Sequence, residues 1–163
     1  MRTYVGALSM FICMALCCSC STTGSGVAKS ERWREKSVDL SIKGDPQLNL
    51  YQNSSHTLYL CTLQLKDPNA FNQLIDERGG MEKLLSECTR FDGSVAYTKR
   101  YVVQPGQLVS DKQDHAEGAR YMGIVAGYYS MKKENVVRLF PISKSINMII
   151  DLGARGILDI REK

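Results

Sequence analysis

The chain has 163 residues, with 21 Lys and Arg against 17 Asp and Glu and a formal net charge of +4 at neutral pH. The two signs are nearly balanced, and this argues against a nucleic-acid-binding protein. Beyond a short amino-terminal segment, the remaining length suits a single domain with one hydrophobic core.

The first 20 residues have the pattern of a lipoprotein secretion signal. Arg2 precedes an apolar run over residues 4–16 that is too short to span a bilayer and ends at the cluster Cys17-Cys18-Ser19-Cys20. Ser19 is small enough for a signal peptidase, so Cys20 is the expected acylated residue and Cys18 the alternative. The usual lipoprotein pattern has Leu three places before that cysteine, where this chain has Cys17. A plain cleaved signal is the competing interpretation.

We therefore expect three parts in the chain: a signal peptide over residues 1–19, acylated Cys20 with a flexible tether over residues 20–36, and a folded domain over residues 37–163. Residues 21–30 are small and polar, as in flexible linkers. No other stretch has the roughly 18 apolar residues that a membrane helix needs. The covalent acyl chains on Cys20 are thus the expected anchor, each buried methylene contributing about 0.8 kcal/mol.

From residue 38 onward the pattern indicates short strands separated by turns. Val38, Leu40 and Ile42 alternate with polar residues, as in a half-buried strand. In the next expected strand, both alternating sets of residues are largely apolar, as in a strand at the middle of a sheet. In the strand after it, one alternating set is apolar except for the charged residue Lys99. The further strands are expected at residues 57–65, 94–103, 108–110, 120–129, 136–142, 146–152 and 157–160, with a Pro-Gly turn at 104–107. Seven to eight such strands predict a mainly β fold, an antiparallel β-sandwich.

Two short helices and two polar loops interrupt this series. Residues 70–76, with Asp67 as the N-cap, and residues 81–88 have helical spacing and are expected to pack on a sheet as an insertion. Residues 50–55 are polar and turn-prone, which predicts an exposed loop. The charged residues 111–117 are also expected to form a polar loop.

Beyond Cys20 the chain has two more cysteines, Cys61 and Cys88. In an oxidising periplasm the pair suggests a disulfide, whose loop of about 28 residues would stabilise the fold by roughly 3 to 4 kcal/mol. The alternative is a buried Cys61 on a strand and a free thiol at Cys88 at the end of a helix. The sequence leaves both interpretations open.

No pattern of catalytic or metal-binding residues stands out, so we expect no enzyme, metal site or cofactor. His56 and His115 lie far apart in sequence and are expected to be solvated loop residues. Asp111, Asp114 and Glu117 lack the spacing of a calcium loop. The tyrosines between residues 97 and 129 could line a glycan-binding face, but their alternation within apolar strands favours core packing.

Three segments resemble, in this order, the TssJ family of outer-membrane lipoproteins from type VI secretion systems. Residues 63–71 (LQLKDPNAF) are similar to the family's strand with a Gln-Leu pair, followed by a Phe that begins the helical insertion. Residues 103–107 (VQPGQ) resemble its Pro-Gly turn, and residues 119–128 (ARYMGIVAGY) its core strand rich in glycine and aromatic residues. The resemblance covers about residues 37–142 and lies behind the lipoprotein signal.

This resemblance implies a transthyretin-like β-sandwich with added helices, held by lipid at the periplasmic face of the outer membrane. It also implies a partner, the periplasmic region of the inner-membrane protein TssM, and no small-molecule substrate. In the family the contact involves the loop between the first two strands. Here that loop consists of Asn49, Leu50, Tyr51, Gln52, Asn53, Ser54 and Ser55. Tyr51 suits such a role as a rigid anchor, and the amide and hydroxyl side chains as adaptable hydrogen-bonding groups.

Two other functions stay open from the sequence. One is a lipoprotein that binds a glycan or small ligand through its sandwich. The other is an accessory or inhibitor subunit of a periplasmic enzyme. Binding to the TssM periplasmic region distinguishes the function implied by the TssJ resemblance from these two alternatives.

Overall fold

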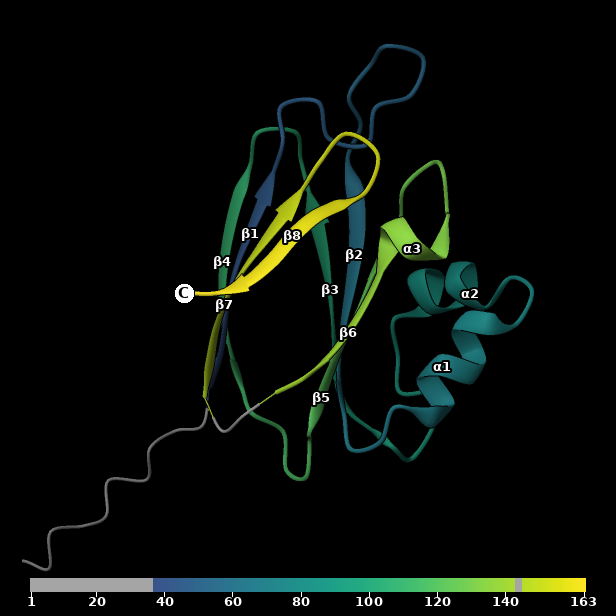
Figure 1. Cartoon of the computed structure of the whole chain (residues 1–163), viewed down its shortest axis with the longest axis vertical. Coiled ribbons are helices and arrows are strands. Elements are labelled where there is room, and N and C mark those ends of the chain that lie inside the picture. The colour runs from purple at the N-terminus through teal and green to yellow at the C-terminus, as the bar shows by residue number, and fades with distance from the viewer. Residues whose placement is uncertain (1–36, 143–144) are drawn as a thin grey trace, which may run out of the picture. The chain divides into compact units, whose positions relative to one another are not determined.

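In the part of the chain that the structure describes, eight strands form two four-stranded sheets that face each other (Figure 1). The computed structural model describes residues 37–142 and 145–163. The first sheet has the order β4-β1-β7-β8 and the second the order β3-β2-β5-β6. The strands are β1 (Ser37–Gly44), β2 (Leu58–Leu65), β3 (Val95–Val103), β4 (Leu108–Asp114), β5 (Tyr121–Ala126), β6 (Val137–Pro141), β7 (Ile146–Leu152) and β8 (Ile157–Glu162). The predicted β-sandwich is thereby confirmed.

One strand pairing differs from the expected antiparallel arrangement. β1 and β7 run parallel, with Val38 opposite Ile146 and Gly44 opposite Leu152. The other pairings between the described strands are antiparallel. Parallel neighbours need a long crossover, and most of the domain lies between these two strands in sequence. The first sheet is therefore mixed.

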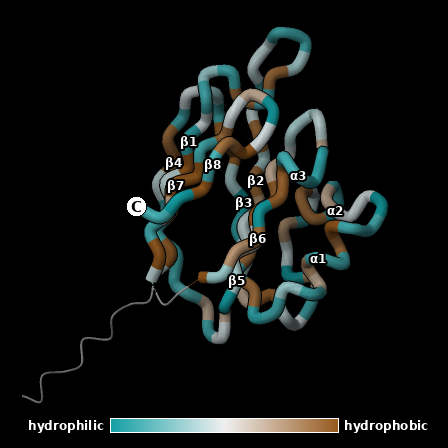
Figure 2. Tube along the Cα trace, viewed as in Figure 1, coloured by the Kyte–Doolittle hydropathy of each residue, from teal (hydrophilic) through white to brown (hydrophobic). Residues whose placement is uncertain are grey.

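Burial explains why the strands differ in their sequence patterns. In β1, Val38, Leu40 and Ile42 are almost fully buried between the sheets, and the residues between them are more exposed. β2 is buried on both faces over most of its length, because one face contacts the first sheet and the other contacts helices. Figure 2 shows hydrophobic stretches along strands of both sheets. An apolar run on both parities therefore marks a strand between two layers.

The helices α1 (Asn69–Asp76) and α2 (Gly80–Glu87) pack on the outer face of the second sheet (Figure 1). The ring of Phe71 lies so close to Gly123 that a Cβ at that position would be 2.9 Å from the ring. The N-cap of α1 is Pro68 rather than Asp67, although the Asp67 carboxylate still accepts the N–H of Asn69 at 2.8 Å. A further short helix, α3 (Lys133–Val136), was not predicted.

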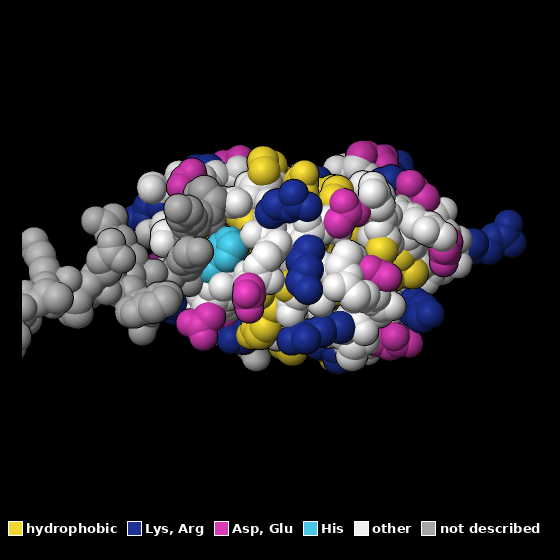
Figure 3. Space-filling model, turned by 90° about the horizontal axis from the view of Figure 1, so that it is seen from below, with side chains coloured by type: hydrophobic (Ala, Val, Ile, Leu, Met, Phe, Trp, Pro, Cys, Tyr) yellow, Lys and Arg dark blue, Asp and Glu magenta, His cyan; other side chains and the backbone are white. Residues whose placement is uncertain are grey.

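β1 runs from one end of the sandwich to the other. Ser37 lies opposite Asp114 at one end, and at the other end the N–H of Gly44 donates to the Gln107 carbonyl at 2.8 Å. The eight residues of β1 span about 25 Å at roughly 3.3 Å per residue. Figure 3 views the end at which β1 begins and shows both basic and acidic side chains on it. The loop after β1 therefore lies at the opposite end (Figure 1).

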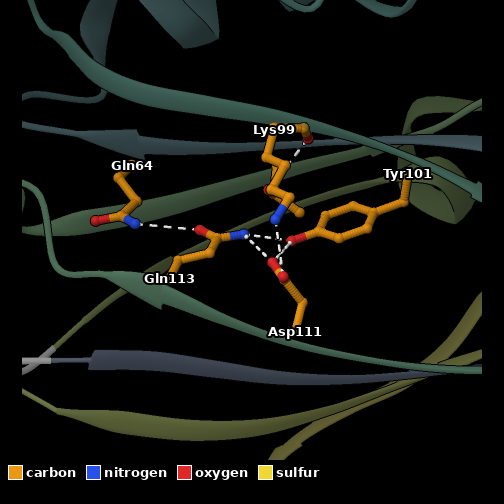
Figure 4. Close-up of polar contacts among 6 residues, drawn as sticks. Gln64, Lys99, Tyr101, Asp111 and Gln113 are labelled. Atoms are coloured by element: carbon orange, nitrogen blue, oxygen red, sulfur yellow. Dashed lines mark hydrogen bonds and ion pairs between the residues drawn. The ribbon is translucent and has the colours of Figure 1, made fainter.

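The prediction of a polar loop over residues 111–117 is wrong for residues 111–114, because β4 continues through Asp114. Two of its polar side chains face inward and meet polar groups of the second sheet (Figure 4). The Asp111 carboxylate accepts from the Lys99 ammonium at 2.7 Å and from the Tyr101 hydroxyl at 2.6 Å. The Gln64 amide donates to the Gln113 side chain at 3.2 Å. Hydrogen bonding between the sheets thus compensates for burying these groups.

Candidate partner-binding site

The loop between β1 and β2 ends in a tight hairpin. Tyr51 and Ser54 exchange two backbone hydrogen bonds of 2.9 Å each. Gln52 and Asn53 between them have φ values of 48° and 60°. A type I′ turn requires this left-handed conformation at both central residues. The tip of the loop is therefore a defined structure that displays two amide side chains.

The base of the loop is tied to two other connections of the sandwich. Asn49 is buried, its amide nitrogen donates to the Thr57 carbonyl at 3.2 Å, and its side-chain oxygen accepts the Tyr129 N–H at 2.9 Å. The Leu50 N–H donates to the Ala154 carbonyl at 2.8 Å. These bonds connect the loop to the segment after β5 and to the turn between β7 and β8. Asn49 consequently holds the loop in place and offers little surface to a partner.

Three rings gather at the surface beside this loop. The rings of Tyr51 and Tyr129 stack with centroids 4.4 Å apart and an angle of 16° between their planes. The His56 imidazole packs edge-on against Tyr129 at 5.0 Å. Tyr51 is 45% exposed and Tyr129 57% exposed. A preformed aromatic surface of this kind suits protein recognition, because its rings lose little conformational freedom on binding.

The aromatic pair forms one wall of a groove of about 480 Å³. Three connections of the chain contribute to it: the β1–β2 loop, the segment from the end of β5 to α3, and the β7–β8 turn. The lining residues are Asn49, Leu50, Tyr51, Gln52, Tyr128, Tyr129, Ser130, Lys132, Asn135, Ala154 and Arg155. We call this hollow the loop groove.

The floor of the loop groove is rigid. The buried Tyr128 hydroxyl donates to the Gly156 carbonyl at 2.8 Å. Burial raises the pKa of the Tyr128 phenol, which keeps this donor neutral at ordinary pH. Gly156 itself lies against Asn135, where an added Cβ would be 3.0 Å from the Asn135 Cβ. The three connections that line the groove are thus packed together at its base.

Only one of these three connections, the β1–β2 loop, was predicted from the sequence to belong to a binding site. Residues 51–55 are exposed, whereas Asn49 is buried and Leu50 is half-buried. Core packing is the right interpretation for Tyr101 and Tyr128 but not for Tyr129, which is exposed. His56 is half-buried against Tyr129 rather than solvated. For the other two connections the sequence indicates at most a turn after a strand. A turn pattern does not indicate which loops lie next to each other in the folded domain.

Cys61 and Cys88 form a disulfide that joins β2 to the residue following α2, with 5.8 Å between their Cα atoms. Both are buried beneath the helices. The predicted acylation at Cys20, its alternative Cys18, the signal peptide and the tether lie outside the described residues.

Within residues 37–142 and 145–163, no three His, Cys, Asp or Glu side chains gather as ligands for a metal ion. The same part of the chain contains no helix with the length and apolar character needed to cross a membrane. The surface features described above are the exposed loop, the ring cluster of Tyr51, His56 and Tyr129, and the loop groove.

Fold and site define a β-sandwich that carries a helical layer on one sheet and a preformed loop at one end. The family described as "Type VI secretion lipoprotein, VasD, EvfM, TssJ, VC_A0113" matches residues 36–155, and the chain belongs to this family. Its members are lipoproteins of the type VI secretion system, and the family is not an enzyme family. No curated protein sequence matches the chain.

Solved structures agree with this fold. The type VI lipoprotein TssJ1 from Pseudomonas aeruginosa is 19% identical, with a TM-score of 0.68 over 79% of this chain and 97% of that chain. Lip from Serratia marcescens, a membrane-bound component of the type VI secretion system, is 17% identical, with a TM-score of 0.63 over 78% and 97%. A chain of the structure described as "T6SS protein TssM C-terminal domain (869-1107) from EAEC" is 15% identical, with a TM-score of 0.63 over 77% and 98%.

Proposed function

We propose that this lipoprotein is acylated at Cys20, lies at the periplasmic face of the outer membrane, and anchors the type VI secretion membrane complex by binding the periplasmic region of TssM. The contact is made by the exposed part of the β1–β2 loop, residues 51–55, together with the ring cluster beside it. The protein needs no cofactor other than its acyl chains.

The placement of the loop carries this proposal. The folded domain begins at Ser37, at one end of β1, and the loop follows at the other end about 25 Å away. A lipid tether that enters at Ser37 leaves the loop end free to face away from the membrane. One surface therefore serves for attachment and the opposite one for capture of a protein from the other membrane.

The chemistry of the loop also supports protein recognition. Tyr51 is an exposed aromatic ring held in place by Tyr129, and the neighbouring side chains of Gln52, Asn53 and Ser54 can donate and accept hydrogen bonds. Exposed tyrosines frequently act as hot spots in interfaces, where removal of one side chain weakens binding by 2 kcal/mol or more. The preformed hairpin reduces the entropy lost when a partner docks.

The proposal is tested by replacing the loop side chains without disturbing the backbone. In the triple variant Tyr51→Ala, Gln52→Gly and Asn53→Gly, the glycines retain the left-handed conformation at the tip. We expect the dissociation constant for the purified TssM periplasmic region to rise at least about 30-fold, since 2 kcal/mol corresponds to that factor. Isothermal titration with the lipoprotein in detergent micelles measures it.

Tyr59→Ala is the matched control, because Tyr59 is 54% exposed but lies on β2 rather than in the loop. This control should bind like the wild-type protein. Unchanged affinity in the triple variant contradicts the loop as the contact site. A folded wild-type protein that does not bind TssM at all contradicts the proposed function and favours a glycan-binding lipoprotein or an accessory subunit of an enzyme.

A further inference from the structure

The lining of the loop groove includes two cations that have no ion pair among the described residues. Lys132 and Arg155 line it and are exposed, and no Asp or Glu is among its lining residues. Neither cation has an ion pair or a side-chain hydrogen bond within residues 37–142 and 145–163. Two free cations therefore border one concave surface.

Two cations on the adjoining elements α3 and β8 do have ion-pair partners. Lys133, next to Lys132 in sequence, forms an ion pair with Asp76. Arg161 on β8 binds both Asp151 and Asp159. Asp45 acts to raise the pKa of the Tyr128 phenol and Arg138 acts to lower it, but neither residue lines the groove. Lys132 and Arg155, by contrast, line the groove without an ion pair among the described residues.

Polar and aromatic groups complete the surface between these cations. The wall made by Tyr51 and Tyr129 offers ring surface to an apolar side chain. Ser130 and Asn135, which also line the groove, can hydrogen-bond to a peptide backbone or a carboxylate. An Arg near an aromatic wall is well suited to bind a carboxylate with two parallel hydrogen bonds.

From this arrangement we propose that the loop groove receives an acidic segment of the partner protein, one that carries at least one Asp or Glu beside an apolar or aromatic residue. The carboxylate binds between Lys132 and Arg155, and the apolar side chain packs on the Tyr51 and Tyr129 rings. This inference rests on the proposed function, because the segment belongs to the periplasmic region of TssM.

The test removes both charges while keeping the side chains polar and of similar length. The variant Lys132→Gln with Arg155→Gln is compared with Lys83→Gln and Arg90→Gln, which remove the same charge from exposed positions on and near α2. The probe is the purified TssM periplasmic region, titrated against the full lipoprotein in detergent micelles at low and at high salt.

We expect the groove variant to bind about tenfold more weakly at low salt, chiefly through slower association, and to lose most of the salt dependence. The control variant should keep both the affinity and the salt dependence of the wild-type protein. A stronger variant, Arg155→Glu, should regain affinity when one Asp or Glu of the TssM segment is changed to Lys. Recovery at one position identifies the acidic residue.

The outcomes separate this inference from the proposed function. If wild type and groove variant bind TssM with the same affinity and salt dependence, the acidic segment is excluded and the proposed function stands. Equal losses in the groove and control variants indicate a general effect of net charge and also overturn the inference. If the wild-type protein does not bind TssM, both proposals fail.

Discussion

Lys99 and Asp111 are charged residues that face the interior of a β-sandwich. Their ion pair of 2.7 Å is only partly exposed, with side-chain exposures of 36% and 20%. Burial acts to raise the pKa of Asp111, but hydrogen bonds from Lys99 and Tyr101 outweigh it, and the net pKa is lowered from the ordinary value of 3.8. The carboxylate therefore stabilises the fold above that pH, and this stabilisation is lost as the pH falls through the lower folded value.

Asp111→Asn tests this contribution. We expect the free energy of unfolding at neutral pH to fall by about 1 to 2 kcal/mol, because a charged acceptor of three hydrogen bonds is lost between the sheets. The decline in stability between about pH 5 and pH 2 should also become shallower than in the wild-type protein. Urea unfolding across this pH range measures both effects.

Asp76→Asn is the control at the residue scale. Asp76 also pairs with a lysine, Lys133, but its side chain is 62% exposed. Exposed ion pairs contribute little, so the change should be below about 0.5 kcal/mol. Equal effects of the two substitutions, or an unchanged pH profile in Asp111→Asn, would show that the buried position of Asp111 has no special energetic role.

At the scale of elements, the helical layer is held to the second sheet by both packing and a covalent bond. Phe71, Ile75 and Leu84 are buried against the outer face of that sheet. The disulfide joins Cys61 in the middle of β2 to Cys88 at the end of α2, across 27 positions of sequence. α1 and α2 lie between the two cysteines, so the closed loop contains the whole helical layer.

Removal of the disulfide should therefore weaken the helices before it weakens the sheets. The chain-entropy model gives a loss of about 3 to 4 kcal/mol for Cys61→Ala with Cys88→Ala. Hydrogen exchange should increase in α1 and α2 more than in β7, and a reductant should lower the unfolding midpoint of the wild-type protein but not of the variant. Two free thiols in wild-type protein prepared without reductant would contradict this prediction.

On the scale of the whole molecule, the start of β1 and the β1–β2 loop lie at opposite ends of the sandwich. β1 begins at Ser37 at one end of the sandwich, and the β1–β2 loop, which lines the loop groove, follows its other end. The end near Ser37 carries side chains of both charges (Figure 3). If acyl chains on Cys20 provide the anchor, loss of the lipid should not alter the binding surface.

Cys20→Ala tests this separation in cells. We expect the variant to move from the membrane pellet to the soluble periplasmic fraction, because two or more acyl chains are needed for stable anchoring. Its purified form should bind the TssM region with wild-type affinity. Cys18→Ala should leave the protein in the membrane fraction. The reverse result for the two cysteines would assign the acyl chains to Cys18.

Much of the fold could be predicted because strand patterns are local. The alternation of Val38, Leu40 and Ile42 indicates one buried face, and the apolar run of β2 indicates two, whatever the neighbouring strands are. The Pro-Gly turn before β4 was also a local signal, and Gly106 has the positive φ that a type II turn requires. These features depend on backbone torsions and on periodicity within a few residues.

Pairings between distant parts of the chain could not be predicted in this way. In the sequence, Lys99 is a charged residue among apolar ones in its strand, and Asp111 belongs to a charged stretch. Only the packing of the two sheets brings these two side chains together. The parallel pairing of β1 with β7 likewise depends on how the whole chain is wound.

By itself, the sequence determined the class of fold, the position of the helical insertion and one exposed loop, since each follows from short-range pattern. The tertiary structure alone decided that Tyr51 stacks on Tyr129 and that the buried Asn49 side chain accepts a hydrogen bond from the Tyr129 N–H. It also decided that Arg155 lines the same groove as Lys132. The physical reason is that these contacts join three connections far apart in the chain. Their proximity is set by the register of the strands that carry them.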